Sequence, residues 1–499
     1  MREKLKPFVL SLGLISVIAS PVFAATGNTN SDAKTTQNKT SVKTSVGETT
    51  PTGNSGPDSI ITGQQNAEAS LQYFPIDIDV PGQSFVSSGP YIGIPLVYSG
   101  GNLIINSPNI NEDVTLLNMR KNINRRMHEL GRTEAEDHAH LLLSGIVEGQ
   151  ALYKDPGVGP NSSDIDLTSA ELDGYILAPS HWTSALFSFA YDNDRGTDEG
   201  SLNNNSRPTN SRLFVNKAFI VLGDFEKSPV YASFGQMYVP FGTYSSNMVS
   251  SPLTKLLGRT KERALVLGFQ QQGANAVYGA GYTFRGDTYV GSTQRISNGG
   301  FNLGYRFSRG KISGDVGGGM IANLADSQGM QNNGNPLPFF GGFGAGSGGG
   351  FEQISHRIPA VNLRGLLSIG SSIDLLAEYI SAVNSFSTSD MTFNSHGAKP
   401  QALNVEGAYT FTAFDKPSSV AIGYAKSKDA LALGLAAQRY SVVFNTSWWK
   451  DTLQSLEVRH DINYAAGNTA TGTGAAVTSV INGSGRPDNM VTAQFDLYF

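Results

Sequence analysis

From about residue 139 to its end, the chain repeats one pattern. Segments of roughly ten residues alternate apolar with polar side chains, and clusters of Gly, Asn, Asp and Pro separate them. Alternation of this kind predicts β-strands that present one apolar and one polar face. The sixteen predicted strands centre near 141–153, 167–178, 182–192, 212–222, 230–239, 263–272, 275–285, 299–308, 311–322, 358–369, 372–383, 401–412, 419–426, 432–446, 453–464 and 490–499.

The composition favours a membrane barrel over a soluble protein. Charged residues make up 15% of the chain, against roughly 25% in soluble domains. Gly accounts for 57 of the 499 residues, and the net charge of −5 gives no reason to expect nucleic acid as a partner. The predicted fold is therefore an all-β, 16-stranded antiparallel transmembrane barrel of the bacterial outer membrane, spanning 139–499.

The predicted connections alternate in length around this barrel. The long ones are 193–211, 240–262, 323–357, 384–400 and 465–489, whereas those between them are mostly a few residues. Outer-membrane barrels have long extracellular loops and short periplasmic turns. An even strand number with this pattern predicts that both chain ends lie in the periplasm.

The residues before the barrel fall into three predicted parts. Residues 1–24 have the basic start, short apolar run and small-residue cleavage pattern of a signal peptide. Residues 25–58 are polar and are expected to be a disordered linker. Residues 59–138 are expected to form a small periplasmic extension with one helix near 110–130. Leu116, Ile123 and Leu130 repeat every seven residues on that helix, which fits a coiled coil, a plug, or packing against its own domain.

Some strands carry charges on the face that should line the lumen. The predicted lumen residues include Arg306, Arg364 and Arg459 among the bases, and Glu378 and Glu406 among the acids. Opposed charges across a pore select polar solutes, although they can also serve only to keep a pore wet. Two strands do not sort cleanly, because 212–222 is apolar on both faces and His460 falls on an apolar face.

Several strings resemble known outer-membrane proteins. The last nine residues alternate strictly and end on Phe499, similar to the closing strand that the barrel assembly machinery reads. The strings 216–225 and 231–242, the latter ending Pro240-Phe241-Gly242, have the look of porins. Together with 251–260 (Ser-Pro-Leu-Thr-Lys-Leu-Leu-Gly-Arg-Thr), 109–114 and 321–327, they resemble LbtU-type siderophore porins.

The resemblance implies a sixteen-stranded barrel with an N-terminal periplasmic extension that admits ferric siderophores, and it supplies no binding residues. The alternatives are a general or nutrient porin for other small polar solutes, and a surface adhesin or structural barrel. A homo-oligomer is possible by analogy with other porins of this size. Outer-membrane lipid and lipopolysaccharide are expected surroundings.

The loop 240–262 is the predicted constriction, since porins often fold one long loop into the lumen. It carries Lys255, Arg259 and Lys261, and Arg263 follows at its end. These four bases are hypothesised to line the path of an anionic solute, or else to meet lipopolysaccharide phosphates at the surface.

No enzyme motif, metal-ligand set or cofactor signature emerges. His138 and His140 could share a face, but no third ligand is evident, and the absence of Cys excludes thiolate sites.

Overall fold

The computed structural model describes residues 78–80, 83–87, 111–129, 139–192, 212–291, 295–344, 352–370, 372–449 and 451–499. The predicted signal peptide and disordered linker lie outside these residues. No helix in the described ranges is both long and apolar enough to cross a membrane.

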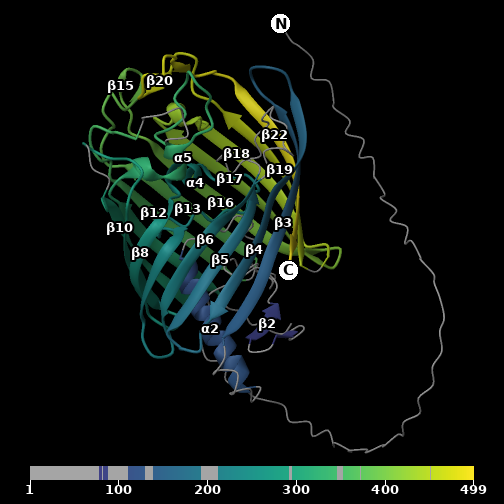
Figure 1. The fold of residues 1–499 in the computed structure, drawn as a ribbon. Helices are drawn as coiled ribbons and strands as arrows, with labels where there is room; N and C mark the ends of the chain where they lie inside the picture. Colours follow the sequence, from purple (N-terminus) through teal and green to yellow (C-terminus); the bar gives the residue numbers. More distant parts are fainter. Residues whose placement is uncertain are drawn as a thin grey trace, which may run out of the picture. The chain divides into compact units, whose positions relative to one another are not determined.

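Sixteen strands form one closed antiparallel barrel, as the sequence predicts (Figure 1). The last strand pairs with the first, from Asn489 opposite Asp155 to Tyr498 opposite Ile146, so the barrel has no free edge. The barrel strands are β3 (His140–Asp155), β4 (Ser162–Leu177), β5 (Thr183–Asp192), β6 (Arg212–Gly223), β7 (Val230–Tyr238), β8 (Lys261–Gln270), β9 (Ala276–Phe284), β10 (Asn298–Arg309), β11 (Ile312–Ile321), β12 (Ala360–Ile369), β13 (Ile373–Ala382), β16 (Gln401–Ala413), β17 (Lys416–Lys428), β18 (Gln438–Thr446), β19 (Thr452–Ile462) and β22 (Pro487–Tyr498).

Each predicted strand is found, and the largest boundary error concerns β18. The sequence predicts a strand from residue 432, whereas β18 begins at Gln438. The preceding residues form the short 3-10 helix η4 (Leu431–Leu433), which ends at Gly434 in the left-handed conformation with φ of 70°. Glycine adopts that conformation without strain, so the apolar run before it can turn instead of extending.

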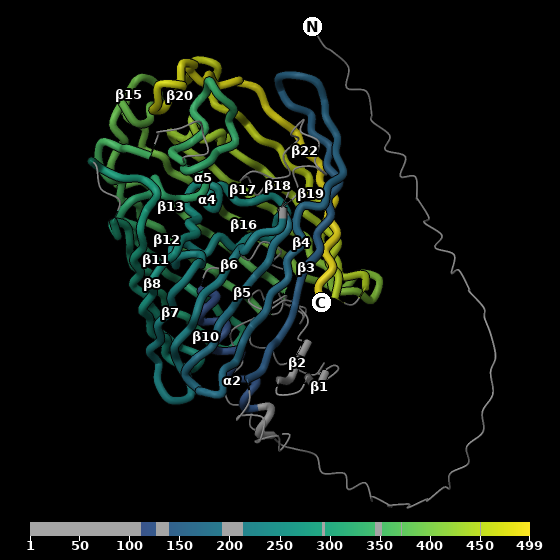
Figure 2. The backbone as a smooth tube through the Cα atoms, in the orientation of Figure 1, coloured from purple at the N-terminus to yellow at the C-terminus, as the bar shows by residue number. Residues whose placement is uncertain are grey.

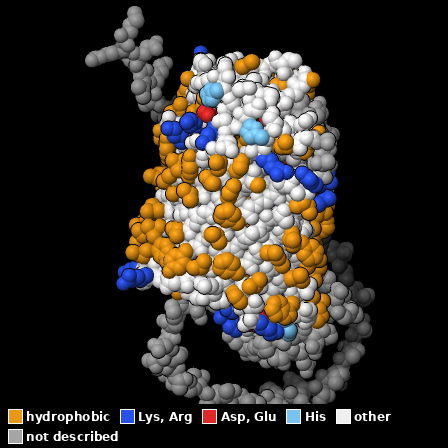
Figure 3. Space-filling model, turned by 90° about the vertical axis from the view of Figure 1, so that its left-hand side faces the viewer, with side chains coloured by type: hydrophobic (Ala, Val, Ile, Leu, Met, Phe, Trp, Pro, Cys, Tyr) orange, Lys and Arg blue, Asp and Glu red, His pale blue; other side chains and the backbone are white. Residues whose placement is uncertain are grey.

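The strands have an apolar outer face and a polar inner face. On β13, Ile373 and Leu375 are exposed on the outer face. Asp374 and Glu378, on the inner face of the same strand, are buried. Figure 3 shows the resulting hydrophobic surface on one side of the barrel, with Lys and Arg side chains gathered at its two borders. A belt of this kind is what a lipid bilayer requires of a barrel exterior.

The two ends of the barrel differ in the length of their connections (Figure 2). At the short-turn rim, β16 and β17 are joined only by Phe414 and Asp415, both with positive φ as in a tight hairpin. The long-loop rim holds the connections 239–260, 322–359, 383–400 and 463–486, among others. One connection at this rim, 156–161 between β3 and β4, is short.

Short strands and helices lie at both rims of the barrel. At the long-loop rim, four short strands form a second sheet, and the helices η2 and α5 lie in the connection between β11 and β12. Their bounds are β14 (Met391–Phe393), β15 (His396–Gly397), β20 (Thr469–Gly472), β21 (Ile481–Asn482), η2 (Leu324–Asp326) and α5 (Gln328–Gln331). On the N-terminal side of the barrel, β1 (Ile78–Val80) pairs with β2 (Gln83–Ser87), and β2 runs parallel to the start of β3.

Candidate functional site in the barrel lumen

The connection 239–260, here called the inner loop, crosses the barrel interior. It leaves β7, includes the short helix α4 (Leu253–Gly258) and returns to β8. Backbone N–H groups of Thr243, Asn247 and Ser250 donate to carboxylates on the far wall, at N···O distances of 2.8, 2.7 and 2.9 Å. The acceptors are Glu378 on β13, Glu406 on β16 and Glu457 on β19. Because these strands lie across the strand order from β7 and β8, the loop spans the lumen.

The three glutamates are anchors of this loop. Glu378 is 7% exposed, Glu406 2% and Glu457 1%, and each accepts both backbone and side-chain hydrogen bonds from the inner loop. Carboxylates accepting several N–H and O–H groups make strong charge-assisted bonds. The alternation of apolar and polar residues predicts that these side chains point inward. Nothing in the neighbouring sequence indicates that they accept hydrogen bonds from a loop more than a hundred residues earlier in the chain.

The four basic residues predicted around this loop do not form one cluster. Lys255 is buried in α4. Arg259 donates from Nε to Gln328 Oε1 at 2.8 Å and lies 4.9 Å from the centre of the Tyr238 ring. Lys261 donates to Asn216 Oδ1 at 2.8 Å. Arg263 shares the exposed, outward face of β8 with the alternate residues that follow it, so its side chain lies outside the lumen.

Two predicted lumen arginines lie on the wall formed by β10, β11 and β12. Arg364 is buried and donates to Asn302 Oδ1 at 2.7 Å and to the Tyr278 hydroxyl at 3.0 Å. Arg306 forms an ion pair with Asp315, with 3.4 Å between Nε and Oδ2. Both guanidinium groups are therefore held in place by neighbours on the same wall.

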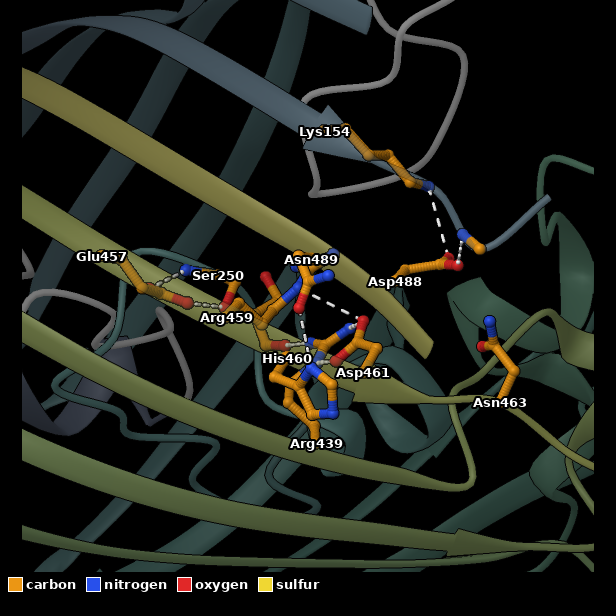
Figure 4. Close-up of polar contacts among 12 residues, drawn as sticks. Lys154, Ser250, Arg439, Glu457, Arg459, His460, Asp461, Asn463, Asp488 and Asn489 are labelled. Carbon is orange, nitrogen blue, oxygen red and sulfur yellow. Dashed lines mark hydrogen bonds and ion pairs between the residues drawn. The ribbon is translucent and has the colours of Figure 1, made fainter. Parts of the chain in front are cut away.

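The third predicted arginine, Arg459, belongs to a larger charged group near the long-loop rim (Figure 4). Asp461 accepts a hydrogen bond from Arg439 Nε at 2.8 Å and forms an ion pair with Arg459, with 3.2 Å between Nε and Oδ2. Lys154 on β3 lies 3.9 Å from Asp488 on β22. We call these five residues the mouth cluster; three cations against two carboxylates give it a formal charge of +1.

The mouth cluster is joined to the inner loop. Arg439 Nη1 donates to the backbone oxygen of Ser251 at 2.9 Å, directly after Ser250, which is anchored on Glu457. The tip of the inner loop therefore lies beside the basic group. Outside this group, His460 points to Asn489, with 2.7 Å between Nδ1 and Oδ1, which accounts for a polar residue on the outer face of β19.

The lumen also contains helix α2 (Glu112–Glu129), at the short-turn end of the barrel (Figure 1). Leu116 and Leu117 are 0% and 1% exposed, and the backbone oxygen of Leu116 accepts a hydrogen bond of 3.0 Å from the inward hydroxyl of Tyr175 on β4. Apolar lumen residues of β6, among them Phe219 and Val221, belong to the same buried cluster. This contact explains why 212–222 is apolar on both faces.

Charged groups at the start of α2 meet the barrel wall. Lys217 Nζ on β6 lies 2.9 Å from Glu112, 3.1 Å from Glu171 and 4.0 Å from Asp173. Asp113 accepts from Ser233 on β7 at 2.8 Å. Burial raises the pKa of Glu112 from an ordinary value of 4.5 to about 7, and the neighbouring Lys217 opposes that rise only in part.

The placement of α2 differs from the sequence prediction in one respect. The helix has the expected length. The sequence analysis assigned it to a periplasmic extension and left a coiled coil, a plug and packing against its own domain open, and the structure packs its buried face against the inside of the barrel. Leu116 and Ile123 are both buried in that contact, so the seven-residue spacing serves packing within the chain. Leu130, the third residue of the predicted seam, lies outside the described residues, as does His138.

The strings that resemble porins also meet one another. Glu112, from the string 109–114, pairs with Lys217, from the string 216–225. Ser327 Oγ, from 321–327, donates to the backbone oxygen of Leu257, from 251–260, at 2.8 Å. Two pairs of these strings are therefore in direct contact within the folded chain. Among the described residues, no group of three or more His, Asp or Glu side chains could hold a metal ion.

The closed barrel, the apolar belt and the internal loop together define an outer-membrane barrel of the porin type. Within that class, the chain belongs to the UPF0422 family. It is 40% identical over 418 residues to a UPF0422 protein of Coxiella burnetii, covering 83% of this chain and 84% of the relative. Identity is 39% over 421 residues to a UPF0422 protein of Legionella pneumophila, covering 83% and 76%. No family model matches the chain.

Solved structures similar in shape include two outer-membrane channels. The channel DcaP of Acinetobacter baumannii aligns with a TM-score of 0.45 and 14% identity, covering 72% of this chain and 97% of that one. An anion-selective porin from Comamonas acidovorans aligns with a TM-score of 0.45 and 10% identity, covering 72% and 100%.

Proposed function

We propose that this protein is an outer-membrane channel for small polar solutes, with the long-loop rim outside the cell and both chain ends in the periplasm. The observation that carries the proposal is the inner loop, which is anchored across the lumen on Glu378, Glu406 and Glu457. A loop folded into a sixteen-stranded barrel narrows the aqueous channel that such a barrel otherwise encloses.

The charges beside the loop favour anions. The mouth cluster carries a formal charge of +1 and lies next to the tip of the inner loop. Arg439 and Arg459 are each only 6% exposed, so we propose that the cluster acts on a passing solute through its electric field. Arginine side chains that flank a pore attract oxygen-rich anions and orient them by bidentate hydrogen bonds. Of the residues that the sequence analysis predicts to line the pore, Arg459 is the one we place in this path, together with Arg439 and Lys154.

Within this class, the finer proposal is that the solute is a ferric siderophore complex. It rests on the resemblance of the strings 109–114, 251–260 and 321–327 to siderophore porins, and on the fit between a basic mouth and an anionic, oxygen-rich complex. The name UPF0422, which the relatives share, states no solute. A nutrient porin for other anions is the alternative.

The remaining partners stay predictions. Arg263 points outward at the long-loop end of β8, where lipopolysaccharide phosphates would lie, and this fits the predicted lipid contact better than a pore role. Recognition of the closing strand β22 by the barrel assembly machinery and formation of a homo-oligomer are expected from the barrel class.

Two measurements test the proposal at its two levels. Purified protein in planar bilayers should conduct, with a preference for anions that falls in Arg439→Ala and Arg459→Ala; no conductance in any preparation would contradict a channel. Uptake of radio-iron as a ferric siderophore should fall in a deletion strain and recover on complementation. Equal uptake in both strains would reject the siderophore and leave the channel standing.

A further inference from the structure

We propose that helix α2 is a releasable plug that closes the short-turn half of the lumen, and that the channel reaches full conductance only when the helix leaves. This inference rests on the proposed channel function. The structure supplies three separate observations for it: how the helix fills the lumen, how one arginine fastens it to the rim, and how polar its buried contact is.

The helix occupies space that the solute would otherwise cross. Its buried residues Val114, Leu116, Leu117 and Ile123 belong to one cluster with lumen side chains of the strands. The fit against the wall is close, since a Cβ added at Gly223 on β6 would lie 3.2 Å from Leu117 Cδ1. The inner loop narrows the channel from the long-loop side, so the lumen holds two independent obstructions in series.

Arg120 fastens the helix to the short-turn rim. Its guanidinium group donates to three backbone oxygens around the turn between β4 and β5: Ser180 at 2.6 Å, Thr183 at 2.9 Å and Ala178 at 3.3 Å. The side chain is only 5% exposed. Loss of this side chain would therefore remove the donor from three backbone carbonyls at the rim.

The contact deeper in the lumen is polar in a way that suits release. Glu112, Asp113, Asn118, Arg120 and Asn122 are all buried on the helix. Around Lys217, three carboxylates share one ammonium group, so the group holds an excess of negative charge. Separating the helix removes Glu112 from this crowded group and lets both surfaces regain water.

The absence of native cysteine makes release directly measurable. Ser233, 0% exposed beneath Asp113, is replaced by Cys, and its reaction with a water-soluble maleimide is timed on the full chain in detergent. Gln150→Cys, on an inner position of β3 that contacts Gln494 and not the helix, reports general access to the lumen. Labelling of Cys at 233 should be slow and labelling at 150 fast.

Adding Arg120→Ala should speed labelling at 233 by about tenfold or more, since at least one charge-assisted hydrogen bond is lost, and leave labelling at 150 unchanged. Lys121→Ala is the matched control, because Lys121 lies next to Arg120 on the helix and its hydrogen bond within the described residues is an exposed one to Gln272. Single-channel conductance should rise in Arg120→Ala and not in Lys121→Ala.

A covalent crosslink between the helix and the barrel wall tests the same proposal by preventing release. Asp113 Oδ2 and Ser233 Oγ are 2.8 Å apart, so the double variant Asp113→Cys with Ser233→Cys can be crosslinked by an oxidant or a short bismaleimide. The oxidised barrel should show reduced conductance that a reductant restores, whereas each single variant should not respond. Equal conductance in the locked and reduced forms would overturn the plug. If no variant conducts, oxidised or reduced, but Arg120→Ala still accelerates labelling at position 233, the proposed channel function is rejected. The proposed release of the helix would then remain supported.

Discussion

The carboxylate of Glu406 on β16 accepts a hydrogen bond of 2.7 Å from the backbone N–H of Asn247 in the inner loop. The strands β7 and β8 that carry this loop lie across the barrel from β16. Ser246 Oγ donates to the same carboxylate at 2.6 Å. The bore of the channel thus depends on a side chain that need not touch the solute.

Glu406→Ala should loosen the inner loop. The substitution leaves the Ser246 and Asn247 donors unsatisfied inside the barrel, which costs on the order of 2–4 kcal/mol. Single-channel conductance and its noise should both increase, and protease should cut near 246–251 faster. Glu148→Ala is the matched control and should leave the inner loop intact, because the described partners of this inner glutamate lie on β3, β4 and β22. Unchanged conductance in Glu406→Ala would show that the loop does not set the bore.

Arg439→Ala should weaken anion preference. Arg439 holds Asp461 through two hydrogen bonds of 2.8 and 3.1 Å, so its removal both lowers the positive charge of the mouth cluster and exposes a carboxylate. Reversal potentials in a salt gradient should shift toward cation preference. Arg263→Ala removes an equal charge outside the lumen and should have no such effect; an equal shift in both variants would assign the selectivity to overall charge.

Release of α2 should depend on pH. The pKa of Glu112 is about 7 in the docked helix because of burial, and returns toward 4.5 when the helix is released. The docked state therefore binds the extra proton, and docking weakens as pH rises from about 4.5 to about 7, then levels off. Asp113, Lys217, Glu171 and Asp173 surround this carboxyl.

Labelling of Ser233→Cys at a series of pH values, corrected for thiolate content with Gln150→Cys, measures this dependence. The corrected labelling rate of Ser233→Cys should rise between about pH 4.5 and about pH 7. It should stay nearly constant over this range when Glu112→Gln is added. A rate that falls with rising pH would contradict the assignment.

Asp326→Ala should loosen the long-loop rim. Asp326 Oδ1 accepts from Thr288 N at 2.8 Å, and Oδ2 accepts from Asn298 Nδ2 at 2.7 Å, which joins the connection after β9 to η2. Burial raises the pKa of this carboxyl, while these donors hold it down. We expect faster proteolysis within 285–291 and a loss of roughly 2 kcal/mol in stability. Ser389→Ala, at an exposed side chain of the same rim, is the control.

The sequence predicted the strands well because their signal is local. Alternation on β13 or β16 is visible within ten residues and fixes which side chains face inward. The partners of those side chains are set by long-range closure, which is why Glu378 and Glu406 were identified as lumen residues without their loop. The apolar inner face of β6 was itself the sign of α2, but a strand apolar on both faces does not say what covers it. Arg439 lies inside the predicted strand 432–446 and was not among the predicted lumen residues, because the apolar run before Gln438 does not follow the alternation that assigns inward positions.

The seam between β22 and β3 also has a consequence for biogenesis. Gly145 and Phe499 exchange backbone hydrogen bonds of 2.8 and 3.1 Å, so the first barrel strand finds its second neighbour only in the last strand to be synthesised. Until then, β3 has an open edge that could pair with other chains, and about 330 residues must stay unaggregated during passage across the periplasm. We therefore expect such a chain to need holding chaperones, and loss of its final strand should make it a target of periplasmic proteases.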